Sequence, residues 1–321
     1  MITNATVQRT IYLRLSITDR CNLRCRYCRP ASAAHSTKRP SQALDSELLS
    51  LVSIIQEQIS IYKLRLTGGV PLLYPQVADL IAQLRQQLPQ TKLCITTNGT
   101  FLVKKVAELK AAGLDSLNIS LDTLNEDIFR ELSGGGCLED TISGISAARE
   151  AGFTDLKLNS VLIRGVNTGS LAELVQFAAR TDCEIRFIEL MPYGQGAALF
   201  HTDYLGAEEA LNSLKQAFSY VGPAAGSGTA SRFQFLVGGR AITVGFITPV
   251  SHPFCSVCDR LRLSRSGRLF ACLRQQQGID LLTPLRRGDL TAVREHIKAG
   301  ICGKHDPGGY WPQHNMVSIG G

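Results

Sequence analysis

The strongest constraint on the fold is a repeated alternation of short strand-like runs with helical patterns between Ile11 and Pro192. Two of the helical patterns are followed by a glycine, Gly113 or Gly152, that can end a helix in the left-handed conformation. Strands joined in series by helices form a parallel sheet, and six such units predict an incomplete barrel rather than a complete eight-stranded one. The expected strands are 11–17, 63–68, 92–98, 116–122, 155–163 and 183–190.

Polar and apolar residues alternate along four of these strands, which gives each strand one polar face. An ordinary parallel barrel fills its interior with branched apolar side chains, whereas this interior would be wet and positive. Burying a cation without a partner is costly, so an anionic ligand or carboxylates should face these side chains. The alternative is an open sheet whose polar face meets solvent. The polar positions are Arg14, Ser16, Lys63, Arg65, Thr67, Asn118, Ser120, Asp122, Lys157 and Asn159.

The composition changes after Pro192, and a segment rich in glycine, alanine and serine at 222–231 is expected to be a surface loop or boundary. We therefore predict two regions, residues 1–222 and residues 223–321. Other elements expected beyond Pro192 are a helix near 207–219, a hairpin of 233–237 and 241–247, and a helix near 289–298.

The composition limits the class of protein. The chain has 321 residues, of which 44% are hydrophobic and 19% charged, and no apolar run approaches the ~20 residues of a membrane span. The first residues carry no secretory signal pattern, which predicts a cytoplasmic location. The net charge of +7 is spread along the chain without the basic run typical of nucleic-acid binding, although a small polyanion remains compatible with it.

Six of the ten cysteines form two groups. The first cysteine triplet is Cys21, Cys25 and Cys28, and the second cysteine triplet is Cys255, Cys258 and Cys272. A reducing compartment disfavours disulfides, so the triplets are candidate metal ligands. Three thiolates can hold three irons of a [4Fe-4S] cluster and leave the fourth iron open, while a zinc site completed by a distant ligand such as His35 is the alternative. The isolated thiols are Cys94, Cys137, Cys183 and Cys302.

The first triplet, with Tyr27 before its last cysteine, resembles the signature of the radical S-adenosylmethionine (SAM) superfamily. Further motifs in the same order along the chain resemble the GTP 3',8-cyclase family, from about Arg9 to Gly321. These motifs are Thr18–Cys28, Leu66–Gly69, Thr96–Gly99, Asn118–Asp122, Arg186–Glu189, Phe254–Ser264 and Gly320–Gly321.

This resemblance implies an incomplete (β/α)6 TIM-like barrel with a C-terminal extension, and a [4Fe-4S] cluster on each triplet. SAM bound to the first cluster would yield a 5'-deoxyadenosyl radical, which would take hydrogen from C3' of GTP so that C3' adds to C8. The product would be (8S)-3',8-cyclo-7,8-dihydroguanosine 5'-triphosphate. This lyase reaction is the first step of molybdenum cofactor biosynthesis.

The resemblance also implies the residues at each ligand. SAM would lie beside Tyr27, Gly69, Asn98, Ser120 and Met191, and GTP beside Arg14, Arg65, Thr96, Lys157, Arg186, Arg260 and Arg262. The implied partners are a reductant protein such as flavodoxin or ferredoxin and cyclic pyranopterin monophosphate synthase as a pathway neighbour. A homodimer is left open, and no membrane or nucleic-acid partner is expected.

One position departs from the family pattern, because Gly68-Gly69-Val70 stands where the family has Gly-Gly-Glu. The glutamate would accept hydrogen bonds from the SAM ammonium, and a valine cannot. We therefore expect Val70 to weaken SAM binding and turnover. The alternatives are a non-catalytic nucleotide-binding paralogue and a radical SAM enzyme that modifies peptides.

Overall fold

The computed structural model describes residues 10–28, 42–226, 228–303 and 311. The strands are β1 (Thr10–Thr18), β2 (Ser60–Gly68), β3 (Lys92–Thr97), β4 (Ser116–Ser120), β5 (Asp155–Leu162), β6 (Glu184–Glu189), β7 (Ser219–Pro223), β8 (Ser231–Val237), β9 (Arg240–Ile247), β10 (Arg260–Leu263), β11 (Arg268–Phe270) and β12 (Ile279–Asp280). The α-helices are α1 (Asp45–Gln58), α2 (Val77–Gln87), α3 (Leu102–Ala111), α4 (Glu126–Ser133), α5 (Leu138–Glu150), α6 (Leu171–Arg180), α7 (Gly196–Asp203), α8 (Ala207–Ala217), α9 (Leu282–Arg286) and α10 (Leu290–Cys302), and the short 3-10 turns are η1 (Pro71–Leu73), η2 (Thr168–Ser170) and η3 (Cys255–Val257).

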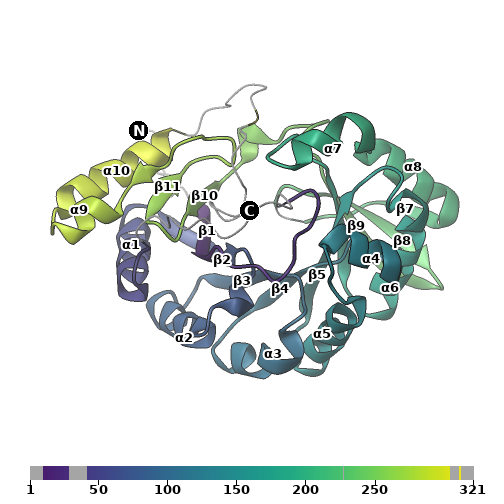
Figure 1. Cartoon of the computed structure of the whole chain (residues 1–321), viewed down its shortest axis with the longest axis horizontal. Helices are drawn as coiled ribbons and strands as arrows, with labels where there is room; N and C mark the ends of the chain where they lie inside the picture. The colour runs from purple at the N-terminus through teal and green to yellow at the C-terminus, as the bar shows by residue number, and fades with distance from the viewer. Residues whose placement is uncertain (1–9, 29–41, 227, 304–310, 312–321) are drawn as a thin grey trace, which may run out of the picture.

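The described strands form one 12-stranded sheet in the order β12-β11-β10-β1-β2-β3-β4-β5-β6-β9-β8-β7. Parallel pairing runs from β10 through β1–β6 to β9. Figure 1 shows these strands as an arc with α1, α2, α3, α5 and α6 along its outside. Because the order ends at β12 and β7 without closing, the barrel is incomplete, as predicted.

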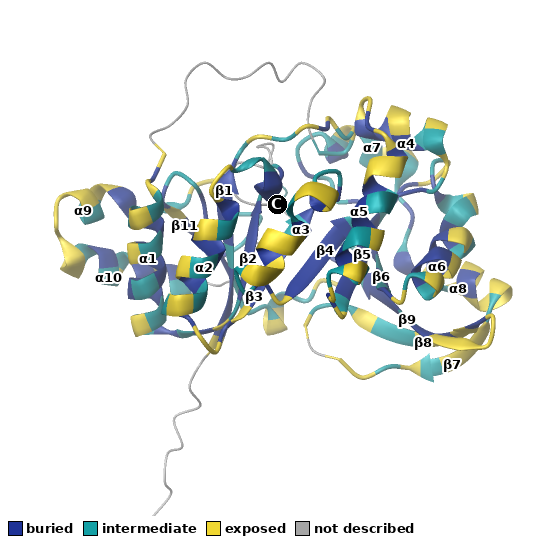
Figure 2. Ribbon diagram, turned by 90° about the horizontal axis from the view of Figure 1, so that it is seen from below, coloured by how far each residue is buried: buried dark blue, intermediate teal, exposed yellow. Residues whose placement is uncertain are grey.

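The outer face of the sheet carries the apolar residues of the alternating pattern. Leu13, Leu15, Leu64 and Leu66 are at most 1% exposed and belong to the same core as the buried faces of the helices. Figure 2 shows the central strands, such as β2 and β4, largely buried and the outward surfaces of the helices exposed. The polar residues therefore face the inside of the arc, which excludes the alternative in which they meet solvent on an open sheet.

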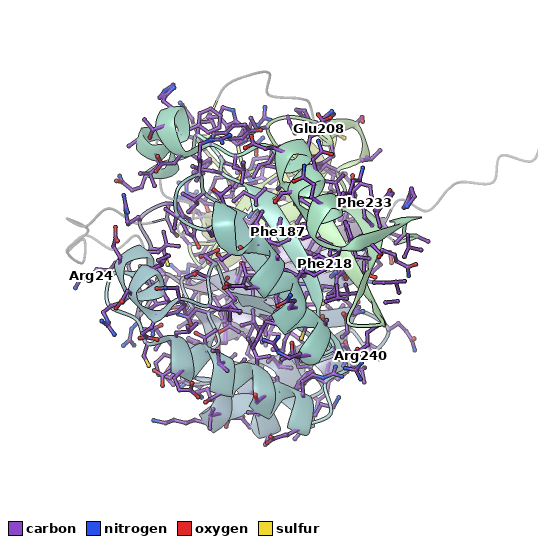
Figure 3. The ribbon with its side chains drawn as sticks, turned by 90° about the vertical axis from the view of Figure 1, so that its right-hand side faces the viewer. Arg24, Phe187, Glu208, Phe218, Phe233 and Arg240 are labelled. Carbon is purple, nitrogen blue, oxygen red and sulfur yellow. The ribbon has the colours of Figure 1, made fainter. Side chains whose placement is uncertain are left out.

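The C-terminal strands extend both edges of the β1–β6 sheet. β9 pairs with β6 and β10 pairs with β1, with Arg14 in register with Arg262. On the β9 side, Phe246 packs against Phe187 and Phe233, with ring centroids 5.7 and 5.9 Å apart. Figure 3 shows Phe187 and Phe233 at this end of the sheet. The two ends of the chain thus contribute to one sheet, and the predicted division at residue 222 remains a prediction.

The predicted hairpin is confirmed as the antiparallel pair β8 and β9. The expected loop at 222–231 is wrong at both ends, because Gly222 lies in β7, which pairs with β8, and Ser231 begins β8. The Gly-Pro ending of β7 is untypical of a strand, but an edge strand tolerates it because only one side is paired. In the described part of the chain, none of the helices has the length and apolar character required to cross a bilayer.

Candidate functional site

The residues predicted to contact SAM come together at one end of the arc. Gly69 and Asn98 directly follow β2 and β3, Ser120 ends β4, and Met191 follows β6. Tyr27 lies with the first cysteine triplet in the segment after β1. The carboxyl ends of parallel strands meet at one edge, where barrels of this kind carry their active sites.

Backbone hydrogen bonds on both sides of Cys25 fix the segment that carries the first cysteine triplet. The amides of Arg24 and Arg26 donate to the carbonyls of Ser133 and Leu132 at the end of α4, at 2.8 and 3.0 Å. Figure 3 shows Arg24 at the outer edge of the molecule. Within the triplet, the amide of Cys28 donates to the carbonyl of Cys25 at 2.9 Å, which holds these two cysteines on one turn.

The turn after β2 packs directly on this segment. The amide of Gly69 donates to the carbonyl of Thr18 at 2.9 Å, and the amide of Val70 donates to the carbonyl of Arg20 at 2.7 Å. A Cβ on Gly69 would lie 2.1 Å from the Arg20 carbonyl oxygen. Gly68 and Gly69 therefore permit a close approach of two backbone segments that a side chain at either position would prevent. Val70, by contrast, is 2% exposed, and its side chain packs in the apolar core.

Polar contacts fix two more of the predicted SAM residues. The hydroxyl of Tyr27 donates to Oδ2 of Asp122 at 2.8 Å, and the amide of Val161 donates to Oδ1 of the same carboxylate. Burial raises the pKa of Asp122 to about 6, although the hydrogen bonds from Val161 and Tyr27 act in the opposite direction. The amide group of Asn98 donates to Asn22 at 2.9 Å, so this residue is tied to the first cysteine segment.

The first triplet offers three cysteine sulfurs on one short segment, a donor set that suits an iron–sulfur cluster. Burial, followed by Asp122, Cys28 and Cys21, raises the pKa of Cys25. No group of three or more His, Cys, Asp or Glu in the described ranges converges closely enough to hold one metal ion. A cubic cluster attaches each thiolate to a different iron, so its three sulfurs need not converge on one metal ion, and a zinc site completed by His35 stays the alternative. His35, Gly320 and Gly321 lie outside the described residues.

The second cysteine triplet lies between β9 and the region after β11. Cys255 begins η3, the amide of Cys258 donates to its carbonyl at 3.2 Å, and the amide of Arg274 donates to Sγ of Cys272 at 3.4 Å. Its donor set is again three cysteine sulfurs. The loop before Cys255 is anchored by Glu189, a carboxylate 1% exposed that accepts the amides of Val250 and Ser251 at 3.1 and 2.9 Å.

Most of the residues predicted to contact GTP lie deeper in the arc, on cross-strand rows. Arg262 is in register with Arg14, which is in register with Arg65. Arg260 begins the preceding row and is followed by Tyr12 and Lys63. A third row contains Thr96, Asn118 and Lys157, with Glu184 at its end. In-register residues of a parallel sheet share a face, so these side chains converge on the inside of the arc.

Arg65 joins several of these residues. It is 1% exposed, and its Nε donates to the Tyr12 hydroxyl at 2.6 Å. One terminal nitrogen donates to the carbonyl of Ile95 at 2.9 Å and to the hydroxyl of Thr96 at 3.3 Å. In the part of the chain that the structure describes, Arg65 makes no ion pair with a carboxylate. Its charge is therefore buried against neutral acceptors or an ionised Tyr12.

The opposite side of the arc does contain carboxylates. Lys157 pairs with Asp155, and Nε of Arg186 pairs with Glu184 at 2.7 Å. Glu184 also pairs with Arg232 at 3.0 Å. The charge of the inner face is therefore partly balanced near β5 and β6.

Burial, together with neighbouring like charges, lowers the pKa of three of these cations. Burial, opposed by Tyr12, lowers the pKa of Arg14 to about 10. Burial, followed by Arg14 and Arg260, lowers the pKa of Arg262 to about 9. Burial, followed by Arg186, lowers the pKa of Lys157 to about 7. Each of these cations would gain a partner when an anion binds, so the depressed values are compatible with an anionic ligand on this face.

Several residues at the site were absent from the predicted contacts. Tyr12 lies two residues before Arg14, so extending the period-two pattern by one step would have included it. Asn118 and Asn159 belong to the polar pattern, and each has a buried side-chain amide oxygen that no described residue hydrogen-bonds. An orphaned acceptor of this kind is costly unless a ligand supplies a donor. A surface hollow of about 670 Å³ beside α8 contains none of the predicted site residues.

Comparison with known families agrees with this arrangement. Residues 15–178 match the Radical SAM superfamily, and residues 183–308 match Molybdenum Cofactor Synthesis C. The GTP 3',8-cyclase of Streptomyces coelicolor is 38% identical over 323 residues, which cover 96% of this chain and 93% of that protein. The GTP 3',8-cyclase of Moorella thermoacetica is 41% identical over 328 residues, which cover 98% of this chain and 99% of that protein.

Solved structures share the fold at low identity. SuiB of Streptococcus suis bound to S-adenosylmethionine has a TM-score of 0.65 and 14% identity, and the match covers 86% of this chain and 64% of that chain. SuiB bound to its precursor peptide SuiA has a TM-score of 0.64 and 15% identity, and the match covers 89% of this chain and 67% of that chain. At this identity the likeness shows the fold alone, so it does not favour a peptide substrate.

Proposed function

Because the chain belongs to the GTP 3',8-cyclase family of the radical SAM superfamily, we propose that it acts on GTP as a lyase and forms (8S)-3',8-cyclo-7,8-dihydroguanosine 5'-triphosphate. This is the first step of molybdenum cofactor biosynthesis, a role that fits the matched C-terminal family. The observation that carries the proposal is the row of Arg262, Arg14 and Arg65 on the inner face. A triphosphate supplies the oxygen anions that such guanidinium groups bind.

The two cysteine triplets are proposed to hold the cofactors. The family uses a [4Fe-4S] cluster and SAM, and we assign the cluster to Cys21, Cys25 and Cys28. A second cluster is proposed on Cys255, Cys258 and Cys272. When bound, SAM on the reduced first cluster supplies the carbon radical that starts hydrogen-atom abstraction.

The chain's own residues bind and orient the ligands in this proposal. Tyr27, Gly69, Asn98, Ser120 and Met191 line the SAM end. The GTP end comprises Arg14, Arg65, Thr96, Lys157, Arg186, Arg260 and Arg262. Asn118 lies in the row of Thr96 and Lys157, and Asn159 is in register with Ser120 and Arg186. Their amide oxygens have no hydrogen-bond partner among the described residues and would accept hydrogen bonds from ligand hydroxyl or amino groups.

Anaerobic turnover tests the proposal. Reconstituted protein is incubated with GTP, SAM and dithionite. The nucleosides and nucleotides are then separated and identified by mass spectrometry. We expect 5'-deoxyadenosine together with a cyclised nucleotide of unchanged elemental composition relative to GTP. GTP binding without 5'-deoxyadenosine would instead identify a non-catalytic paralogue, and turnover only with a peptide would identify a peptide-modifying enzyme.

The remaining partners are also proposals. A flavodoxin or ferredoxin would supply the electron, and cyclic pyranopterin monophosphate synthase would consume the product. The cytoplasmic location and the homodimer stay predictions from the sequence.

A further inference from the structure

Tyr12 lies at the centre of the cations on the inner face. Its phenol oxygen accepts Nε of Arg65 at 2.6 Å and a terminal nitrogen of Arg14 at 3.4 Å. The ammonium of Lys63 lies 5.0 Å from the ring centroid, and the guanidinium carbon of Arg260 lies 5.7 Å from it. The ring is 8% exposed. A single buried oxygen thus serves two guanidinium groups, while two more cations lie over the ring.

The charges around Tyr12 come from every strand packed against it. β1 contributes Arg14, β2 contributes Lys63 and Arg65, and β10 contributes Arg260 and Arg262. The nearby carboxylate of Asp259 accepts the hydroxyl of Tyr62 at 2.6 Å. Tyr62 keeps its proton, because burial, followed by the hydrogen bond to Asp259, raises its pKa.

We propose that Tyr12 is a positioning residue of the triphosphate site, whose phenol oxygen serves the arginines as an internal anion in the empty chain and takes up a proton when a triphosphate arrives. The inference rests on the proposed function, since it assumes that GTP phosphates approach these arginines. In the absence of GTP, the phenol oxygen of Tyr12 thus accepts the hydrogen bonds that a phosphate oxygen would accept.

The electrostatics agree with the geometry. Burial opposes ionisation of Tyr12, but Arg65, followed by Arg14, Arg260 and Lys63, lowers its pKa to about 7. Phosphate oxygens then compete for the same guanidinium groups and bring negative charge beside the phenolate. The phenolate binds one proton from solvent and becomes a neutral phenol, which still accepts a hydrogen bond from Arg65.

Calorimetric titration measures this proton directly. Holoprotein with both triplets reconstituted is titrated with GTP under anaerobic conditions, without SAM or reductant, in buffers of different ionisation enthalpy. The protons bound per GTP follow from the dependence of the heat on the buffer. We expect the parent chain to bind about one proton more than Tyr12→Phe at pH 8 and about none more at pH 6, as a group titrating near pH 7 requires.

Two controls separate Tyr12 from its neighbours. Tyr62→Phe removes a neighbouring phenol outside the arginine contacts and should leave proton uptake unchanged. Lys157 is present in every variant, so its own titration cancels from the difference. Guanosine, which carries no phosphate, should give no difference between the parent chain and Tyr12→Phe.

The outcomes are distinct. If GTP produces no binding heat in the parent chain, the proposed function fails. If GTP binds but the parent chain and Tyr12→Phe take up equal numbers of protons at pH 8, the role of Tyr12 is refuted, as it is if guanosine produces the same difference as GTP. Should Tyr12→Phe not fold, 3-fluorotyrosine at position 12 replaces it, and its more acidic phenol must shift the pH midpoint of proton uptake downward.

Discussion

Val70 illustrates how one side chain alters a site without altering the fold. Its backbone keeps the hydrogen bond to Arg20 that shapes the turn after β2, and its side chain is buried in the apolar core. The turn is therefore stable with valine, but it offers nothing polar to the ammonium of SAM. We therefore expect the departure from Gly-Gly-Glu to lower SAM affinity without preventing folding.

Restoring the carboxylate tests this interpretation. We expect Val70→Glu to bind SAM roughly 10- to 150-fold more tightly, since a charged hydrogen bond contributes ~1.5–3 kcal/mol. The variant should also melt at a lower temperature, because part of the carboxyl group is buried among apolar residues. Val70→Gln is the matched neutral control and should gain much less affinity. An anaerobic titration with equal SAM affinity for Val70→Glu and the parent chain contradicts the hypothesis.

Lys157 gives the stability of the ligand-free chain a pH dependence. Burial, followed by Arg186, lowers its pKa from 10.5 to about 7 in the folded state. Between these values the unfolded chain binds more protons at this residue, so its contribution makes the fold more stable as the pH rises. Below pH 7 the folded chain holds a buried ammonium that is crowded by Arg186, although it still pairs with Asp155. Asp155 also pairs with Lys92, so it keeps a partner when Lys157 is replaced.

Lys157→Met removes the titrating group and should remove this dependence. We expect the variant to melt at a higher temperature than the parent chain at pH 6–7, and the gap to shrink toward pH 9 as Lys157 loses its proton. Scanning calorimetry without GTP measures both proteins across this range. A gap of constant size would show that Lys157 is not the group responsible.

At the scale of elements, turns rather than strands bring the predicted SAM residues together. Gly69 lets the turn after β2 contact the backbone of the first cysteine segment. Gly196 has a similar function at the start of α7, because a Cβ there would lie 2.5 Å from the carbonyl oxygen of Met191 and 3.5 Å from that of Tyr27. Two segments far apart in the sequence therefore meet through glycine backbones.

A single methyl group at Gly69 should separate these segments. We expect Gly69→Ala to lose most of the iron of the first triplet after anaerobic reconstitution, because its Cβ would overlap the Arg20 carbonyl at 2.1 Å. Gly169→Ala is the control, since nothing lies within 4 Å of its Cβ. Iron and sulfide analysis and thermal melting compare the two variants. Full iron loading of Gly69→Ala would show that the close approach is not needed.

The sequence predicted these elements well where a local pattern determines them. The strands around Arg14, Arg65 and Lys157 follow a period of two, and Gly113 and Gly152 adopt the expected left-handed conformation at φ 93° and 77°. The sequence did not predict the pairing of β10 with β1 or of β9 with β6, because register between distant strands depends on tertiary packing. The pairs of Lys157 with Asp155 and of Arg186 with Glu184 join residues two apart on one strand, so the period of two could have predicted them.

At the scale of the whole molecule, the C-terminal region completes the sheet rather than forming a separate layer. β9 covers the edge of β6, and α10 packs beside α1, where Arg294 pairs with Glu57 at 3.2 Å. Cutting the chain at residue 222 would uncover the edges of both β1 and β6. Long uncovered edges of parallel strands promote association between chains.

We therefore expect residues 1–222 to aggregate when produced alone. Supplying residues 223–321 as a second chain should restore some soluble complex, because the missing strands can pair with both edges. Size-exclusion chromatography and circular dichroism compare the fragment, the mixture and the intact chain. A monomeric fragment with a cooperative melting transition would contradict this expectation and support two independently folding domains.

The pairing of β1 with β10 also sets an order of events during synthesis. Arg14 cannot meet Arg262 until the ribosome has added the residues between them. At ~5–20 residues per second, that interval lasts roughly tens of seconds. The cysteines near the amino terminus emerge long before their surroundings are complete. A cell that makes this protein must therefore keep the thiols of the first cysteine triplet reduced until β10 has been synthesised and can pair with β1.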